Sequence, residues 1–154
     1  MRKQIVIGML CLLMTVFTAC GGGEDVSIDL QAVGDALNDE VAFTDTLTQI
    51  PSESAVALYG LDAEAVVNAV VFVSSGATAE EFALWEAADS AGVEAIIEAA
   101  TLRMASQAEN YADYKPAEVP KLENFILKKQ GNYVVLCASD DNETAETVLA
   151  EYGF

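Results

Sequence analysis

An uninterrupted apolar run, AVVFV at residues 69–73, lies near the middle of the chain. Successive residues of a strand point to opposite faces of a sheet, so a run without polar alternation is typical of a strand buried on both faces. Its valines favour extended structure over helix. The run predicts a strand over residues 68–74, ended by a turn at Ser74-Ser75-Gly76.

The next segment, residues 80–87, carries two conflicting signals. Thr78 and Glu81 have the spacing of a helix capping box, and the composition favours a helix. Two-residue alternation, with Phe82 and Leu84 on one side, favours a strand instead. The residues by themselves leave both open.

Amphipathic helices are predicted from apolar side chains that recur at steps of three and four residues. The first helix runs from Ser27 or Asp29 to Val41. The second has a cap at Asp89 or Ser90, continues through Val93 and Tyr111, and stops before Pro116. The third begins at Asp140, with Glu143 in its first turn.

Residues 124–129 and 132–138 form a predicted hairpin around Gln130-Gly131-Asn132. With the preceding strands, the order strand, strand, helix occurs twice. This order predicts an α+β fold: a four-stranded antiparallel sheet from two ββα units, with helices packed on one face, plus an N-terminal helix. Residues 42–51 are only weakly strand-like and are not assigned to the sheet, and residues 51–60 are interpreted as a short turn or helix.

The N-terminus has a different character. Arg2 and Lys3 precede IVIGMLCLLMTVF, an apolar run over residues 5–17. Spanning a membrane takes about 20 residues, so this run is short, and with its basic start it is typical of a secretory signal peptide. The competing interpretation is a buried N-terminal helix or strand, which the lack of a polar face disfavours.

Phe17-Thr18-Ala19-Cys20 resembles the lipobox of bacterial lipoproteins, with Phe17 where Leu is usual. The resemblance implies that the Cys20 thiol takes a diacylglycerol and that the chain is cut before it. We expect a lipoprotein signal peptide over residues 1–19, a lipidated cysteine and flexible tether over 20–27, and a single α+β domain over 28–154. The expected location is extracytoplasmic, where the lipid on Cys20 anchors the protein to the cell membrane.

The charge excludes one class of partner. Loss of Arg2 and Lys3 takes the formal charge from −18 to −20, with 25 acids and five bases after the cut. Nucleic-acid binding requires Lys and Arg to neutralise phosphates, so no nucleic-acid partner is expected. The simplest explanation for so many acidic residues is that they keep the protein soluble.

Residue types also limit the chemistry. Cys11 leaves with the signal and Cys20 is lipidated, so Cys137 has no disulfide partner, and its apolar surroundings predict an inert buried thiol. The chain has no histidine, which removes Ser-His-Asp and Cys-His catalysis. No cofactor motif is present, and none is expected.

Residues 111–129 form the candidate partner contact. Aromatic side chains are over-represented at interfaces, and a basic patch on an acidic body can orient a partner. The alternative is that this segment simply closes the core. The candidate residues are Tyr111, Tyr114, Lys115, Lys121, Lys128 and Lys129.

The segment SDDNETAE at residues 139–146 is a weak candidate for Ca²⁺ binding, because its side chains offer oxygen ligands. It lacks the order of an EF-hand loop, and we favour a capped helix N-terminus instead. The candidate ligands are Asp140, Asp141, Asn142 and Glu143, with Glu146 nearby.

A second acidic segment is SSGATAEE, where Ser74, Ser75 and Thr78 precede Glu80 and Glu81. A glycosidase needs two carboxylates about 5–10 Å apart across a cleft. Chance pairs are expected in so acidic a chain, so a capped turn is the favoured interpretation.

Three segments resemble a family of bacterial lipoproteins catalogued as domain of unknown function 4358: the one from Val70 to Ala87, the one from Arg103 to Asn124, and the one from Lys128 to Leu149. The resemblance covers about residues 29–152. In that family the segment after the Ser-Ser-Gly turn usually forms a strand, which decides the choice for residues 80–87. The resemblance implies a surface lipoprotein of Gram-positive-type bacteria and carries no known catalytic or binding residue.

The expected function is therefore a lipid-anchored, non-catalytic binding or interaction module at the cell envelope, with a possible envelope protein as partner. The alternatives are a carboxylate-dependent hydrolase of envelope or environmental polysaccharide and a structural spacer lipoprotein. The sequence sets no oligomeric state.

Overall fold

The structure is a computed structural model, and it describes residues 27–154. The predicted signal peptide, Cys20 and nearly all of the predicted tether lie outside the described residues. From residue 27 onward, no helix is both long enough and apolar enough to cross a membrane.

One five-stranded antiparallel sheet forms the middle layer, with strand order β1-β2-β3-β5-β4. The strands are β1 (Thr48–Ile50), β2 (Val66–Val73), β3 (Glu81–Ala87), β4 (Ile126–Gln130) and β5 (Tyr133–Ala138). The helices are α1 (Leu30–Glu40), α2 (Ser52–Tyr59), α3 (Ser90–Tyr114), α4 (Val119–Glu123) and α5 (Asn142–Glu151), with short 3₁₀ helices η1 (Ala63–Ala65) and η2 (Pro116–Glu118).

The α+β class and the antiparallel sheet are confirmed, but the predicted number of strands is wrong. The fifth strand is β1, which pairs Thr48–Ile50 with the last three residues of β2. It is short and largely exposed at the sheet edge. A strand of this kind has no apolar run to reveal it, which is why residues 42–51 look only weakly strand-like.

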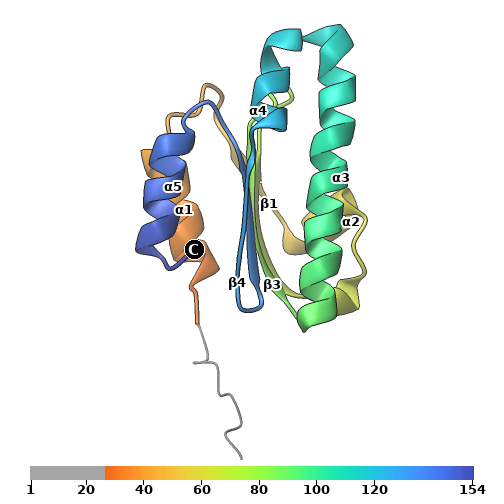
Figure 1. Cartoon of the computed structure of the whole chain (residues 1–154), viewed down its shortest axis with the longest axis vertical. Helices are drawn as coiled ribbons and strands as arrows, with labels where there is room; N and C mark the ends of the chain where they lie inside the picture. The colour runs from red at the N-terminus through yellow and green to blue at the C-terminus, as the bar shows by residue number, and fades with distance from the viewer. Residues whose placement is uncertain (1–26) are drawn as a thin grey trace, which may run out of the picture.

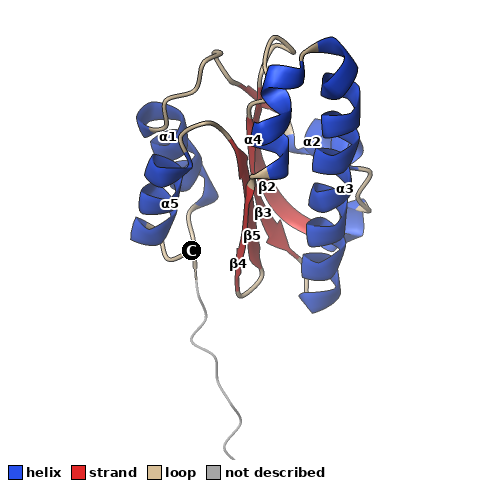
Figure 2. Cartoon of the chain, turned by 45° about the horizontal axis from the view of Figure 1, so that its top comes forward, coloured by secondary structure: helices blue, strands red, loops and turns tan. Residues whose placement is uncertain are grey.

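The prediction that the helices pack on one face is also wrong. Helices α1 and α5 cover one face of the sheet, and α2, α3 and α4 cover the other (Figures 1 and 2). Alternate residues of β3 divide between the two cores: Phe82 and Leu84 pack toward α1 and α5, and Ala83 and Trp85 pack toward α3. The apolar character of β2 on both sides reflects these two buried faces.

The strand predicted over residues 80–87 is confirmed as β3. It lies between β2 and β5 and is almost entirely buried. Pairing on both edges and packing on both faces outweigh the helix propensity of its alanines and leucine, because propensity is a weak effect beside tertiary burial.

The other elements follow the sequence patterns closely. Asp89 caps α3 by accepting a hydrogen bond from Gly92 N at 2.9 Å, and the predicted apolar stripe of α3 faces the sheet. The hairpin turns at Gly131, which has a positive φ of 56°.

Helix α5 is capped by Asp141 rather than by Asp140, one residue later than predicted. The segment before β4 is not a plain loop, since it contains η2 and α4.

Candidate functional site

An ion cluster surrounds the buried Lys121 on α4. Its Nζ lies 3.1 Å from Glu80 Oε1, 3.0 Å from Glu118 Oε2 and 3.2 Å from Asp140 Oδ2. The Glu80 side chain is fully buried and that of Lys121 is 3% exposed. The cluster joins the segments before β3, around α4 and before α5, which are the three segments that carry the family resemblance.

Hydrogen bonds saturate the Glu80 carboxylate. It accepts from Thr44 N at 3.0 Å, from Asp45 N at 2.9 Å and from Thr78 Oγ1 at 3.0 Å, in addition to Lys121. Buried charged groups are tolerated when they are paired and hydrogen-bonded in this way. The arrangement is that of a structural anchor that fixes the 42–46 loop to the start of β3.

The pKa values in the cluster follow from the same contacts. Burial alone would raise the pKa of Glu80, but the backbone donors of Thr44 and Asp45, with Lys121, hold it below its usual range. Burial likewise opposes ionisation of Glu118, and the Ala79 amide and Lys121 lower its pKa overall. Burial disfavours the Lys121 ammonium, yet its three carboxylate partners raise its pKa above the usual value. All three groups are therefore charged at neutral pH.

A second, partly buried ion pair lies on the α3 face of the sheet. Arg103 Nε and Nη2 donate to Glu81 Oε1 and Oε2 at 2.7 and 2.6 Å, which makes a bidentate ion pair. The Tyr59 hydroxyl donates to Glu81 Oε1 at 2.5 Å, and the Arg103 guanidinium carbon lies 5.1 Å from the centre of the Tyr59 ring. Burial, followed by the charge of Glu81, raises the pKa of Tyr59 well above its usual value. The tyrosine is therefore a neutral donor.

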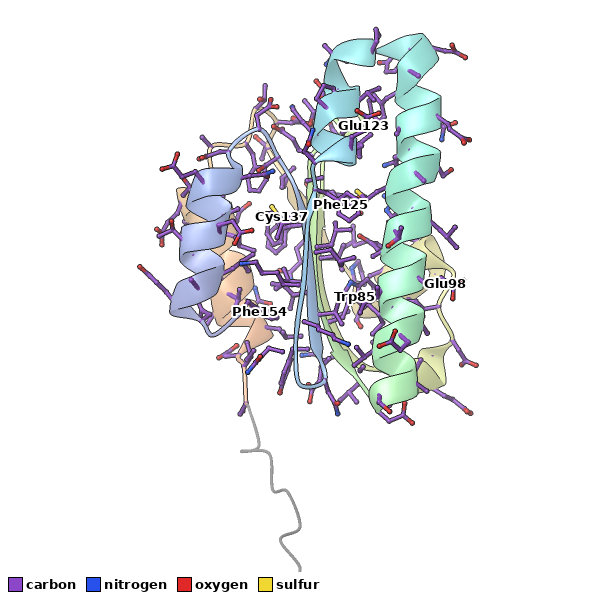
Figure 3. All side chains as sticks on the ribbon, in the orientation of Figure 1. Trp85, Glu98, Glu123, Phe125, Cys137 and Phe154 are labelled. Atoms are coloured by element: carbon purple, nitrogen blue, oxygen red, sulfur yellow. The ribbon has the colours of Figure 1, made fainter. Side chains whose placement is uncertain are left out.

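The Tyr59 ring also meets Trp85 edge to face, with ring centres 4.9 Å apart. Trp85 is the single tryptophan of the chain and lies between α3 and the sheet (Figure 3). Its side chain is fully buried, and its Nε1 finds no hydrogen-bond partner in the part of the chain that the structure describes.

Two cavities meet at Arg103. The larger one, of about 650 Å³, lies between the C-terminal end of α2 with its following loop and the outer side of α3. The smaller one, of about 300 Å³, lies between residues 73–81 and α3. Both are lined by Leu58, Arg103 and Gln107, so we treat them as one depression, the α2–α3 groove.

The α2–α3 groove combines polar and apolar side chains. Asp62 and Glu98 stand on its two walls, and Figure 3 shows Glu98 pointing outward from α3. Leu58 and Leu102, which also line it, are 44% and 62% exposed. A concave surface of this size with a few convergent polar groups is the usual setting for ligand binding.

The predicted contact segment 111–129 does not form one basic patch. The structure buries Lys121 in its ion cluster, so this residue is not available to a partner. Lys128 and Lys129 are successive residues of β4 and point to opposite faces of the sheet, where Lys128 pairs with Glu146 of α5 and Lys129 with Glu94 of α3.

The aromatic end of that segment lies beside the smaller cavity. Tyr111 is buried and its hydroxyl donates to Thr78 O at 2.6 Å, so it closes the core at this point. Tyr114 is 72% exposed. The Lys115 ammonium donates to Ala77 O at 2.5 Å and lies 3.7 Å from Glu118. Contact of Tyr114 and Lys115 with a partner stays a prediction.

The side chains of the weak Ca²⁺ candidate make other contacts. Asp140 pairs with Lys121, and Asp141 caps α5 through Thr144 N at 3.3 Å and accepts from Ala42 N at 3.2 Å. Asn142 donates to Asn124 O, and Glu143 lies in the first turn of α5. Between residues 27 and 154, no three acidic, histidine or cysteine side chains are placed to hold a metal ion together.

Glu80 and Glu81 both line the smaller cavity, as the hydrolase alternative requires. Each is neutralised by its own cation, Lys121 for Glu80 and Arg103 for Glu81. The adjoining hydroxyls are also engaged: Ser74 Oγ donates to Thr78 O and Ser75 Oγ donates to Asp45. This is the pattern of a capped turn.

Sequence reasoning missed Arg103 and the groove itself. Arg103 is an isolated base within a helical stripe, and nothing nearby in the sequence marks Glu81 as its partner. No local sequence signal marks the groove, because Leu102, which falls outside the predicted apolar stripe of α3, is a single apolar residue of a kind that is common on protein surfaces.

Comparison with known protein families gives a match. Searches of curated proteins and of solved structures find nothing similar to the chain. The profile of one family, described as "Domain of unknown function (DUF4358)", matches residues 39–139, which is well over half of the chain. The matched segment holds the whole sheet, α2 to α4 and every residue that lines the groove. The chain belongs to the DUF4358 family.

Proposed function

We propose that this protein is a lipid-anchored, extracytoplasmic binding module that takes its ligand in the α2–α3 groove. The observation that carries the proposal is the pair of adjoining cavities with Leu58, Arg103 and Gln107 on their common wall. The anchor rests on the sequence around Cys20, which supplies a thiol after a short apolar run.

The exposed Tyr114 and the half-buried Lys115 extend the proposed contact surface beyond the groove. The Tyr114 ring lies 6.1 Å from that of Tyr111, which lines the smaller cavity. Tyrosine supplies a large contact area and a polar group at one position. A protein partner in the groove would meet these two residues at the C-terminal end of α3.

The contacts at Glu80 and Glu81 favour binding over hydrolysis. Glu80 and Glu81 are successive residues, so their side chains leave the chain in opposite directions rather than facing each other across a cleft. Each carboxylate accepts hydrogen bonds from its own cation and from at least one other donor. A nucleophile or general acid needs a carboxyl group that is free to react.

Crosslinked capture from native membranes tests the proposal. The tagged full-length protein is compared with Leu102→Glu, which puts a charge in the groove, and with Ala105→Glu, which puts the same charge on α3 at an exposed position outside it. We expect a stoichiometric partner with the parent protein and Ala105→Glu, and loss of that partner with Leu102→Glu.

A Cys20→Ser variant tests the anchor in the same experiment and should leave the membrane fraction. Equal capture by Leu102→Glu and the parent would rule out the groove as the contact. Absence of any partner in all samples would favour the spacer alternative.

A further inference from the structure

In the described part of the chain, every basic side chain is paired with a carboxylate. Of the 25 acids in the sequence, only Glu24 and Asp25 lie outside residues 27–154. The five bases in that range each lie within 4.0 Å of a carboxylate: Arg103, Lys115, Lys121, Lys128 and Lys129. The unpaired surface charge is therefore negative, and it attracts positively charged ligands.

The α2–α3 groove shares this excess of negative charge. Asp62 and Glu98 line the larger cavity from opposite walls, and neither forms an ion pair with a described base. The one base on the lining is Arg103, and Glu81 already neutralises it through two hydrogen bonds. The net charge of the lining favours a cation over an anion.

The C-terminal end of α2 also favours a cation in the groove. Its C-terminal residues, from Ala57 to its cap at Gly60, line the larger cavity, and its last turn contains no basic side chain. The C-terminal end of a helix carries the negative end of the helix dipole. A cation in the groove would therefore meet the carboxylates of Asp62 and Glu98 and the negative end of this helix dipole.

The rest of the groove is suited to a peptide. Leu58 and Leu102 present apolar surface on opposite walls. Ser106, Gln107 and Asn110 follow on the same side of α3, and none of their side chains has a hydrogen-bond partner among residues 27–154. Hydroxyl and carboxamide groups can pair with the N–H and C=O groups of an extended backbone.

Resting on the function proposed above, we propose that the occupant of the α2–α3 groove is an extended basic segment of a partner protein. A Lys or Arg side chain of that segment lies between Asp62 and Glu98, and an apolar side chain near it packs on Leu58 and Leu102. Its backbone pairs with Gln107 and Asn110. A small polyamine could meet the carboxylates, but it has no apolar side chain to pack on the leucines and no peptide backbone to pair with the carboxamides.

The protein carries its own reporter for this binding. Trp85 is the single tryptophan, and its ring contacts Tyr59, which lines the larger cavity. A ligand that presses on the Tyr59 wall should change Trp85 emission. Titration calorimetry provides a second readout that does not depend on the fluorophore.

The first experiment uses the Cys20→Ser chain, which lacks the predicted lipidation site, and three probes. These are the blocked hexapeptide Leu-Lys-Ala-Leu-Arg-Ala, its acidic counterpart Leu-Glu-Ala-Leu-Glu-Ala, and spermidine, each titrated to about 1 mM, the weak end of measurable affinity. We expect saturable binding of the basic peptide, weaker binding at higher salt, and no binding of the acidic peptide. Binding of spermidine as tight as that of the basic peptide would overturn the peptide occupant.

The second experiment compares matched charge reversals on α3. Glu98→Lys removes one wall carboxylate, and Glu109→Lys makes the same change at an exposed position that does not line the groove. Glu98→Lys should weaken the basic peptide about tenfold, and Glu109→Lys should weaken it less than about twofold. Equal effects would indicate a general charge effect and overturn the site.

The two sets of measurements separate the identity of the occupant from the role of the groove. If the basic peptide does not bind while Leu102→Glu still abolishes capture from membranes, the groove is a binding site for another ligand and the basic occupant is wrong. If capture does not depend on Leu102, the groove proposal itself fails.

Discussion

The Lys121 ammonium lies 3.1 Å from the Glu80 carboxylate, and both side chains are shielded from solvent almost completely. The two residues are 41 positions apart in the sequence. Their contact holds α4 against the start of β3, close to the smaller cavity. The arrangement of the residues at this end of the groove therefore depends on the ion pair between Lys121 and Glu80.

Replacement of Lys121 by Met should lower the free energy of unfolding by about 3–5 kcal/mol, because removing one partner leaves buried carboxylates without their cation. Urea unfolding followed by Trp85 fluorescence measures this. Lys115→Met is the matched control, since Lys115 is 41% exposed and should change stability by less than about 1 kcal/mol. Equal effects of the two substitutions would show that burial does not set the strength of the Lys121 contacts.

The pH dependence of stability should isolate Glu80. Its folded-state pKa lies below the ordinary value of 4.5, so its contribution is fully present above pH 4.5 and is lost as the pH falls through the folded-state value. Glu80→Gln should therefore be less stable than the parent at pH 7, and the difference should shrink below pH 4.5. A difference that stays constant from pH 7 to pH 3 would contradict the depressed pKa.

Much of the fold is readable from the sequence because its signals are local. The β2 run, the α3 stripe and the Gly131 turn each specify their element within a few residues. The second layer of helices is harder to predict. Helix–sheet packing depends on which face each helix meets, and amphipathic periodicity gives the apolar side of a helix but not its partner surface.

The candidate site was less predictable because its contacts are set by the folded chain and not by nearness in the sequence. Lysines close together in a sequence do not form a patch when strand alternation separates them, as it does for Lys128 and Lys129. The Arg103–Glu81 pair joins α3 to β3, 22 residues apart, and only the folded chain brings them together.

Calcium should not stabilise the domain. Asp140 is bound to Lys121 and Asp141 caps α5, so a Ca²⁺ ion would have to displace existing contacts of both residues. We expect the melting temperatures in millimolar Ca²⁺ and in EDTA to agree within about 1 °C, since a stabilising ligand raises this temperature by mass action. A clear rise in Ca²⁺ that Asp141→Asn removes would instead establish an ion site at this helix start.

The thiol of Cys137 should react only when the domain unfolds. It is fully buried on the α1 and α5 side of β5 (Figure 3), and burial raises its pKa to about 12. The thiolate is the reactive form, so both its low population at pH 8 and its lack of access slow modification. In a Cys20→Ser chain that starts at residue 20, Cys137 is the single cysteine. Its labelling by a disulfide reagent should therefore follow the unfolding rate.

The matched control for this prediction is Ala105→Cys in the same background, which places a second thiol at an exposed position of α3. That thiol should react within seconds to minutes, while Cys137 should become reactive only when urea is added. Rapid reaction of Cys137 in native conditions would mean that the α1 and α5 layer opens without global unfolding. Since α1 and α5 lie almost entirely outside the segment matched by the family profile, such opening would identify this layer as the less stable half of the domain.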